Sequence, residues 1–120
     1  MENTLQSKVI DDVILWINDN LELKLSLDII TQKSGYTKWH LQRLFKSQTG
    51  MPIGAYIRAK RLDCVATALA NTSENIIDIS IRYQFDSQQT LCKVFKHRFN
   101  MTPSIYRKTL KLKNIREPLA

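Results

Sequence analysis

The residues with the most distinctive chemistry lie in the stretch 36–46, YTKWHLQRLFK. On a helix, at about 100° per residue, Trp39, Gln42 and Arg43 fall on one face together with Lys46. An indole offers an apolar plane for thymine methyl groups, while an amide and a guanidinium can each make two hydrogen bonds to a base edge. This spacing therefore suits a helix that enters the major groove of DNA. The alternative is a solvated basic face that happens to carry one exposed tryptophan, which is common.

A helix that presents these residues must bury its opposite face, which carries Leu41, Leu44, Phe45 and Gln48. Thr37 is a suitable N-cap because its hydroxyl can accept a hydrogen bond from a free amide at the helix start. Gly35, two residues earlier, permits a tight turn. The sequence therefore predicts a helix that starts at Thr37 and presents its first two turns.

The chain repeats itself at an offset of 50 residues. The aligned identities are Asp28 with Asp78, Ile29 with Ile79, Leu41 with Leu91, Phe45 with Phe95, Lys46 with Lys96, Met51 with Met101 and Tyr56 with Tyr106. The same shift pairs Thr37 with Ser87, another N-cap residue, whereas Trp39, Gln42 and Arg43 pair with Gln89, Cys92 and Lys93. A duplicated helical unit leaves such a pattern. The two copies share a buried face but differ on the exposed face, as expected if each reads different DNA.

Apolar periodicity, caps and breakers predict an all-α fold of about seven helices. The expected helices cover about 4–20, 27–34, 37–48, 53–71, 76–83, 87–98 and 103–112. Ser26 and Asn75 are the expected caps of the two short helices, Trp16 is expected in the core, and Tyr56 and Tyr106 are expected to pack inside. This order predicts two helix-turn-helix motifs, at about 26–48 and 76–98, in a homeodomain-like arrangement. Residues 113–120 form the expected disordered tail.

The long helix expected at 53–71 connects the two motifs. Its apolar residues cover an arc wider than one packing stripe, which indicates contacts on two sides. Nineteen residues span about 28 Å, near the roughly 34 Å between successive major-groove faces of a duplex. We therefore expect this helix to hold two reading heads on one side of the DNA.

Charge and composition narrow the function further. The net charge is +7, but residues 1–35 carry −3 and residues 36–120 carry +10. A basic field favours nucleic acid or another polyanion, although many basic proteins bind neither. Cys64 and Cys92 lack paired spacing and are expected to be reduced thiols. The sequence has no membrane span or signal peptide, which predicts a cytoplasmic protein that does not bind membranes.

Enzyme signatures are absent from the sequence. His40 and His97 have no Cys, Asp or Glu at ligand spacing, and there is no Gly-rich phosphate loop or Ser/His/Asp arrangement. We therefore expect no catalysis, no metal and no cofactor. A helical protein-interaction module or adaptor with only non-specific DNA affinity is the remaining alternative, although charged reading faces are unlike the core of a protein interface.

The chain resembles the AraC/XylS family of transcription activators, in particular its small MarA/SoxS/Rob-type members. The matching stretches are SGYTKWHLQRLFKSQTG, IGAYIRAKRL and YQFDSQQTLCKVFKHRFNMTPSIYR, within roughly residues 8–108. The resemblance implies a DNA-binding domain, here about 1–112, that binds an asymmetric promoter element as a monomer and recruits RNA polymerase. It also implies control of antibiotic efflux and oxidative-stress genes. A chain of 120 residues leaves no room for a sensing domain, so we expect no small-molecule ligand and control by protein abundance.

Carried over to this sequence, the family pattern implies the following base-contacting residues: Trp39, Gln42, Arg43, Gln88, Gln89, Thr90 and Lys93. The expected contacts to the DNA backbone are Lys38, His40, Lys46, Arg58, Ser87 and Lys96. Lys93 stands where close relatives usually carry Arg, and Lys lacks the planar two-donor fork that Arg offers to guanine. Readout there is expected to be looser, and the second motif could act mainly on the DNA backbone.

Several of these assignments stay open at the level of sequence. Gln88 and Gln89 either read adenine or are solvated amides. Arg58 and Arg61 either contact phosphate or form a structural ion pair. His40 contacts a phosphate or a base edge, or neither. The choice of activator over repressor rests on the resemblance alone, because both would use the same DNA-binding face.

Overall fold

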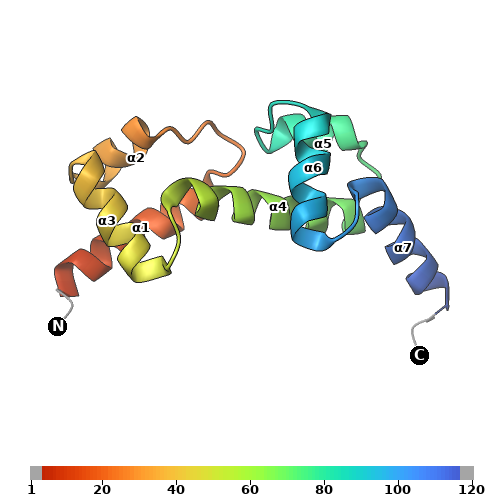
Figure 1. Cartoon of the computed structure of the whole chain (residues 1–120), viewed down its shortest axis with the longest axis horizontal. Helices are drawn as coiled ribbons and strands as arrows, with labels where there is room; N and C mark the ends of the chain where they lie inside the picture. Colours follow the sequence, from red (N-terminus) through yellow and green to blue (C-terminus); the bar gives the residue numbers. More distant parts are fainter. Residues whose placement is uncertain (1–3, 117–120) are drawn as a thin grey trace. The chain divides into compact units, whose positions relative to one another are not determined.

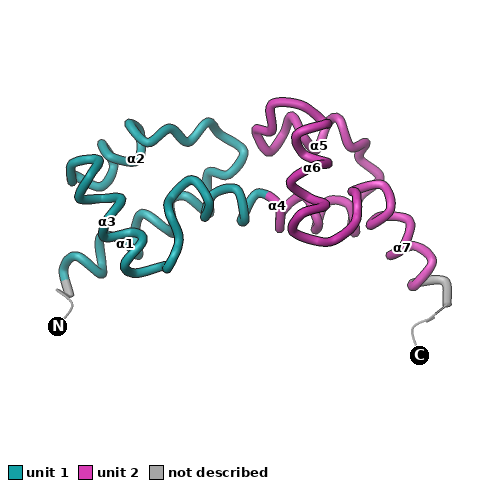
Figure 2. The backbone as a smooth tube through the Cα atoms, viewed as in Figure 1, with its two compact units in different colours: residues 1–61 teal, residues 62–120 magenta. Residues whose placement is uncertain are grey.

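The computed structural model describes residues 4–116, and the side chains of residues 5–113. This part of the chain contains seven helices and no strand, which confirms the predicted all-α class (Figure 1). The helices are α1 (Thr4–Asp19), α2 (Leu27–Ser34), α3 (Lys38–Thr49), α4 (Ile53–Asn71), α5 (Ile76–Arg82), α6 (Gln88–Phe99) and α7 (Pro103–Arg116). The chain divides within α4 into two compact units, residues 1–61 and 62–120 (Figure 2).

Unit 1 is built from α1, α2, α3 and the first part of α4. Helices α1, α2 and α3 pack against one another pairwise. Their buried residues are aliphatic except for one aromatic ring: Ile10, Val13, Ile17, Leu21, Ile30, Leu41, Phe45, Ile53 and Ile57. Trp16, which the periodicity placed in the core, is only half-buried, with the Lys33 ammonium 5.9 Å from its ring centroid. Val13 and Ile17 occupy the inward face of α1, so Trp16 lies at the border between the buried and exposed faces of this helix.

Local capping defines the first helix-turn-helix. The Ser26 hydroxyl accepts a hydrogen bond from the amide of Ile29, and the Thr37 hydroxyl accepts one from the amide of His40. Gly35 ends α2 in the left-handed conformation, at φ 79°, where a side chain would be strained. Both predicted caps and the predicted glycine turn are therefore confirmed. They determine where α2 stops and where α3 starts.

Unit 2 repeats this construction with α5, α6, α7 and the last part of α4. Its core joins Leu62, Val65, Ala66, Ala68 and Leu69 of α4 to Ile79, Tyr83, Leu91 and Phe95. The predicted caps are again confirmed, because the Asn75 side chain accepts from the amide of Asp78 and the Ser87 hydroxyl from the amide of Thr90.

The offset of 50 residues holds for α3 and α6 but not for α2 and α5, whose N-caps are offset by 49. The two N-caps lie 11 positions apart in the first motif (26 to 37) and 12 in the second (75 to 87). The extra residue lies in the turn after α5, where Gln84 adopts φ 65°. The alignment of Ile29 with Ile79 was therefore wrong: Ile29 is 42% exposed, and it is Ile30 that is fully buried like Ile79.

The aromatic pairs are the same in both units. The rings of Phe45 and Tyr56 meet edge to face with centroids 5.3 Å apart at 75°, and those of Phe95 and Tyr106 at 5.3 Å and 76°. This confirms that Tyr56 and Tyr106 are packing residues. It also means that α3 and α6 are each held by a phenylalanine in the same local geometry.

The last helix is longer than predicted. Helix α7 begins at Pro103 as expected but continues to Arg116 rather than ending near residue 112. No glycine or proline interrupts 104–116, and the first breaker is Pro118. The rest of the predicted tail, 117–120, lies outside the described residues. Within the described part of the chain, every helix is too short or too polar to cross a membrane.

Candidate nucleic-acid interface

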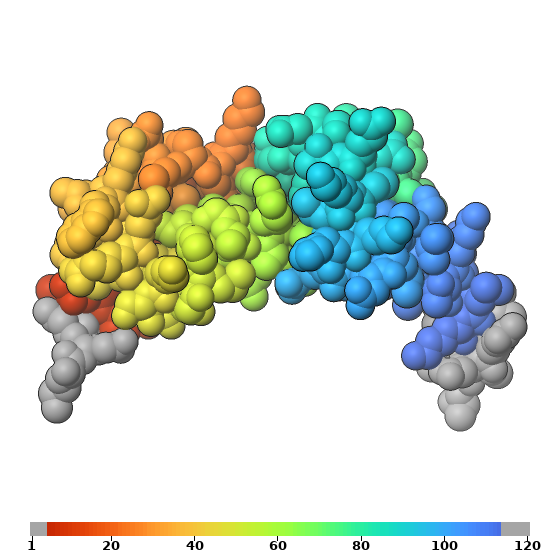
Figure 3. Space-filling view, in the orientation of Figure 1, coloured from red at the N-terminus to blue at the C-terminus, as the bar shows by residue number. Residues whose placement is uncertain are grey.

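Helix α3 is oriented by its two fully buried residues, Leu41 and Phe45. With these side chains in the core, the opposite face of the helix meets solvent. Trp39 is 70% exposed, and Gln42, Arg43 and Lys46 are exposed beside it. Helix α3 therefore forms part of the surface of unit 1, in yellow tones in Figure 3. The four side chains that the sequence placed on one face are presented together, as the periodicity predicted.

Trp39 and Arg43 also contact each other. The guanidinium carbon of Arg43 lies 5.0 Å from the centroid of the Trp39 ring, which is a cation–π arrangement. Stacking restricts a long side chain that would otherwise sample many rotamers. The indole therefore does more than offer an apolar plane, because it also holds the two-donor fork of Arg43 at the surface. The spacing i, i+4 permits this contact, but the sequence alone did not reveal it.

Two residues expected to contact the DNA backbone are engaged within the protein. The Lys38 ammonium pairs with the Asp28 carboxylate of α2. Both groups are largely exposed, so this pair contributes little stability and can open. The His40 ring is half-buried and meets the Tyr36 ring edge to face at 4.8 Å. His40 is thus a packing residue first.

Helix α6 is oriented by buried residues in the same way as α3, but it exposes a different set of side chains. Leu91 and Phe95 are fully buried. Gln88, Gln89, Lys93 and Lys96 are exposed, and α6 contributes to the surface of unit 2, in blue tones in Figure 3. This face has amides and ammonium groups but neither an aromatic plane nor a guanidinium fork. It can donate hydrogen bonds and positive charge, with less geometric selectivity than α3.

Two residues predicted to contact DNA, Ser87 and Thr90, hydrogen-bond to each other at the start of α6. The Ser87 hydroxyl donates to the Thr90 hydroxyl oxygen at 3.0 Å while it accepts from the Thr90 amide. Thr90 is half-buried. Ser87 therefore serves primarily as a cap, whereas the Thr90 hydroxyl still has its own O–H to donate to DNA.

The two arginines early in α4 differ in role. Arg58 is exposed. Arg61 donates from Nε to the Leu21 carbonyl at 3.0 Å and from Nη2 to the Leu23 carbonyl at 2.6 Å. Partial burial lowers the pKa of the Arg61 guanidinium, which stays protonated at neutral pH. Arg61 therefore has a structural role that neither alternative named, because its fork holds the segment after α1.

A second structural arginine went unnoticed in the sequence. Arg107 donates from Nε to the Leu69 carbonyl and from Nη2 to the Thr72 carbonyl, at the end of α4. Arg98 pairs with Asp63 at 2.9 Å. The basic character of unit 2 thus includes cations that stabilise the fold. No spacing signal distinguishes such residues from DNA contacts, because their acceptors, two backbone carbonyls for Arg107 and a carboxylate for Arg98, are far away in sequence.

Comparison with known proteins agrees with this arrangement. Residues 30–109 match the family described as "Helix-turn-helix domain". The chain is 51% identical over 102 residues to the HTH-type transcriptional activator AarP of Providencia stuartii, covering 85% of this chain and 76% of that one. It is 46% identical over 100 residues to the multiple antibiotic resistance protein MarA of Escherichia coli K12, covering 83% and 79%.

A longer relative and a solved structure extend the comparison. The transcriptional regulator Rob of Salmonella typhimurium is 50% identical over 104 residues, which cover 87% of this chain but only 36% of Rob. An AraC-type transcriptional regulator from Chromobacterium violaceum has the same fold, with a TM-score of 0.81, 27% identity and coverage of 90% and 96%.

AarP is named as a transcriptional activator and Rob as a transcriptional regulator. Two capped helix-turn-helix motifs, exposed polar faces on α3 and α6, and these identities lead to one assignment. The chain belongs to the AraC/XylS family of DNA-binding transcription regulators.

Proposed function

We propose that this regulator binds an asymmetric promoter element as a monomer, and that α3 provides most of the sequence discrimination. The observation that carries this proposal is the exposed face of α3, where Arg43 is stacked on Trp39 and Gln42 lies one turn along. Arg43 donates to guanine and Gln42 reads adenine, while the indole packs on thymine methyl groups. Lys46 on this helix contacts phosphate.

Helix α6 makes the second, weaker set of contacts in this proposal. Gln88, Gln89 and Lys93 face the bases, and Lys96 faces the DNA backbone. The difference between the two helices supports an asymmetric site, because a single chain with two unlike reading faces matches two unlike half-sites. A solved structure of the AdpA DNA-binding domain with its target DNA has the same fold, with a TM-score of 0.82 at 18% identity.

We further propose that bound protein activates transcription by recruiting RNA polymerase, at genes for antibiotic resistance, efflux and oxidative stress. AarP is described as a transcriptional activator and MarA as a multiple antibiotic resistance protein. These descriptions support the proposal because about half of the aligned residues of this chain are identical to those of AarP and MarA.

Selection of bound sequences from random duplexes at about 150 mM salt tests the reading faces. Wild type should enrich a non-palindromic motif of about two helical turns. Arg43→Ala should lose about 5- to 150-fold in specific affinity and become degenerate in one half of the motif. Lys8→Ala, which removes one positive charge from an exposed position of α1, is the matched control and should leave the motif unchanged.

Other outcomes point elsewhere. If Arg43→Ala kept full discrimination, α3 would not be the reading helix. If wild type enriched nothing, the chain would be an interaction module with only non-specific DNA affinity. A palindromic motif, or two copies on one site by sedimentation, would refute monomeric binding.

A further inference from the structure

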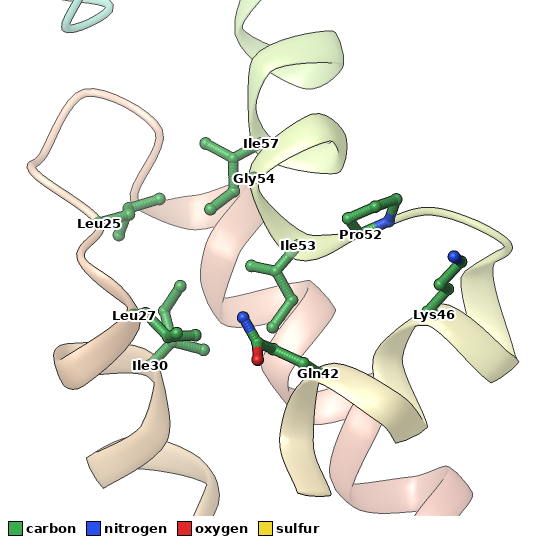
Figure 4. Close-up of a pocket in the computed structure, with 9 residues that line it drawn as sticks. All are labelled: Leu25, Leu27, Ile30, Gln42, Lys46, Pro52, Ile53, Gly54 and Ile57. Carbon is green, nitrogen blue, oxygen red and sulfur yellow. The ribbon is translucent and has the colours of Figure 1, made fainter. Parts of the chain in front are cut away.

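Unit 1 contains a hollow of about 390 Å³ beside α3, which the DNA-reading proposal does not use. Five aliphatic side chains line it (Figure 4): Leu25, Leu27, Ile30, Ile53 and Ile57. They come from the segment before α2, from α2 itself and from the start of α4. The volume is within the usual range for small-molecule sites, about 300 to 1,000 Å³.

One of the lining residues has no side chain. Gly54, in the first turn of α4, is among the lining residues, and a Cβ added there would meet no atom within 4 Å. Its backbone is ordinary helix, since the glycines with positive φ are Gly35 and Gly50. Glycine in a helix costs about 0.5 to 1 kcal/mol relative to alanine. The backbone therefore does not require glycine at position 54, and a side chain there would enter open space at the lining.

Two polar side chains of α3 border this apolar lining, Gln42 and Lys46. They lie one helical turn apart. Figure 4 shows the Gln42 amide beside Ile53 and the Lys46 side chain on the side of Pro52. Within the described residues, no carboxylate pairs with Lys46. An apolar cavity with one unpaired ammonium and one amide at its edge is complementary to a single carboxylate attached to an apolar body.

We propose that this hollow binds a small apolar monocarboxylate, contrary to the expectation from chain length that there is no small-molecule ligand, and that binding competes with DNA. The apolar body lies among Ile30, Ile53 and Ile57, and the carboxylate accepts hydrogen bonds from Lys46 and Gln42. The competition, but not the binding, rests on the proposed function, in which these same two side chains contact DNA. The ligand then removes one base contact and one phosphate contact together.

Binding is tested first without DNA. The full chain, labelled with ¹⁵N, is titrated with 4-phenylbutyrate at constant ionic strength. Amide shifts should saturate, with half-saturation on the order of 1 mM as expected for a ligand of this size, and the largest shifts should lie in 25–30, 42–46 and 53–57. The neutral 4-phenylbutyramide should bind at least several-fold more weakly.

Two variants separate the site from general affinity for anions. Gly54→Leu fills the hollow and should lower affinity at least tenfold, while Lys46→Gln removes the charge and should abolish the preference for the acid over the amide. If Gly54→Leu proves unfolded by circular dichroism, Gly54→Ala gives the smaller loss expected of one methyl group. The site would be refuted if the amide shifts of wild type did not saturate, or if Gly54→Leu bound 4-phenylbutyrate as tightly as wild type.

Competition is tested next by fluorescence anisotropy on the selected duplex. The apparent Kd for DNA should rise about twofold at the half-saturating ligand concentration, and it should not rise for Gly54→Leu. Saturable binding with unchanged DNA affinity would refute the competition. If Arg43→Ala kept full discrimination, the proposed function would be refuted. The ¹⁵N titration would still test the ligand site, because it is carried out without DNA.

Discussion

The stacking of Arg43 on Trp39 makes a quantitative prediction about DNA reading. If the indole holds the guanidinium for guanine, the two residues must contribute cooperatively to specific binding. Trp39 is 70% exposed, and cation–π contacts at exposed sites are worth about 0.5 to 1 kcal/mol. A double-mutant cycle of Trp39→Ala and Arg43→Ala should therefore give a coupling energy of about 0.5 to 1 kcal/mol, or about 2- to 5-fold in Kd.

The assay is fluorescence anisotropy on the selected duplex at fixed salt, with all four proteins measured on a scrambled duplex as the control. Each single variant should lose about 1 to 3 kcal/mol on the selected duplex and little on the scrambled one. The double variant should lose less than the sum. Additive losses within about 0.3 kcal/mol would mean that the contact plays no part in reading DNA. Equal coupling on both duplexes would mean that it acts on non-specific binding alone.

Three further predictions concern capping, the structural arginine and the second reading helix. Thr37→Ala should lower the free energy of unfolding by about 1 kcal/mol in urea denaturation, because the N-cap hydrogen bond of α3 is lost, whereas Thr37→Ser should keep it. Arg61→Met should cost about 1 to 2 kcal/mol, since the carbonyls of Leu21 and Leu23 lose a charged donor; an unchanged stability with altered DNA specificity would return Arg61 to the interface. Lys93→Arg should sharpen base discrimination in the second half of the selected motif, as read by the same selection, and an unchanged motif would mean that residue 93 does not face a base.

Local chemistry explains why so much of the fold was predictable. Helices α3 and α6 each start at a hydroxyl residue that caps them, Thr37 or Ser87, and these bonds span three residues. The orientation of α3 follows equally from local spacing, because burying Leu41 and Phe45 leaves only one face for Trp39. Helix caps and helix orientation can therefore be predicted from residues that are neighbours in the sequence.

Several roles that the sequence did not reveal depend on partners in other elements of the chain. Arg61 was expected at phosphate or in an ion pair, but its acceptors are carbonyls about 40 positions earlier. Lys38 pairs with Asp28 across the turn between α2 and α3. The hollow beside α3 is bounded in part by Gly54, whose missing side chain matters only once the helices are packed. A spacing rule contains no information about such contacts.

The two units combine a shared interior with different surfaces, and this combination bears on how the regulator recognises DNA. Phe45 with Tyr56 and Phe95 with Tyr106 adopt the same ring geometry, so each reading helix is anchored alike within its own unit. Differences in DNA contact must then come from the exposed side chains rather than from the anchoring of the helix. Helix α3 presents an aromatic plane and a guanidinium fork, whereas α6 presents amides and ammonium groups. Under the proposed function, exchanging outward residues while the interior stays the same would change the DNA sequence that is bound without changing the fold.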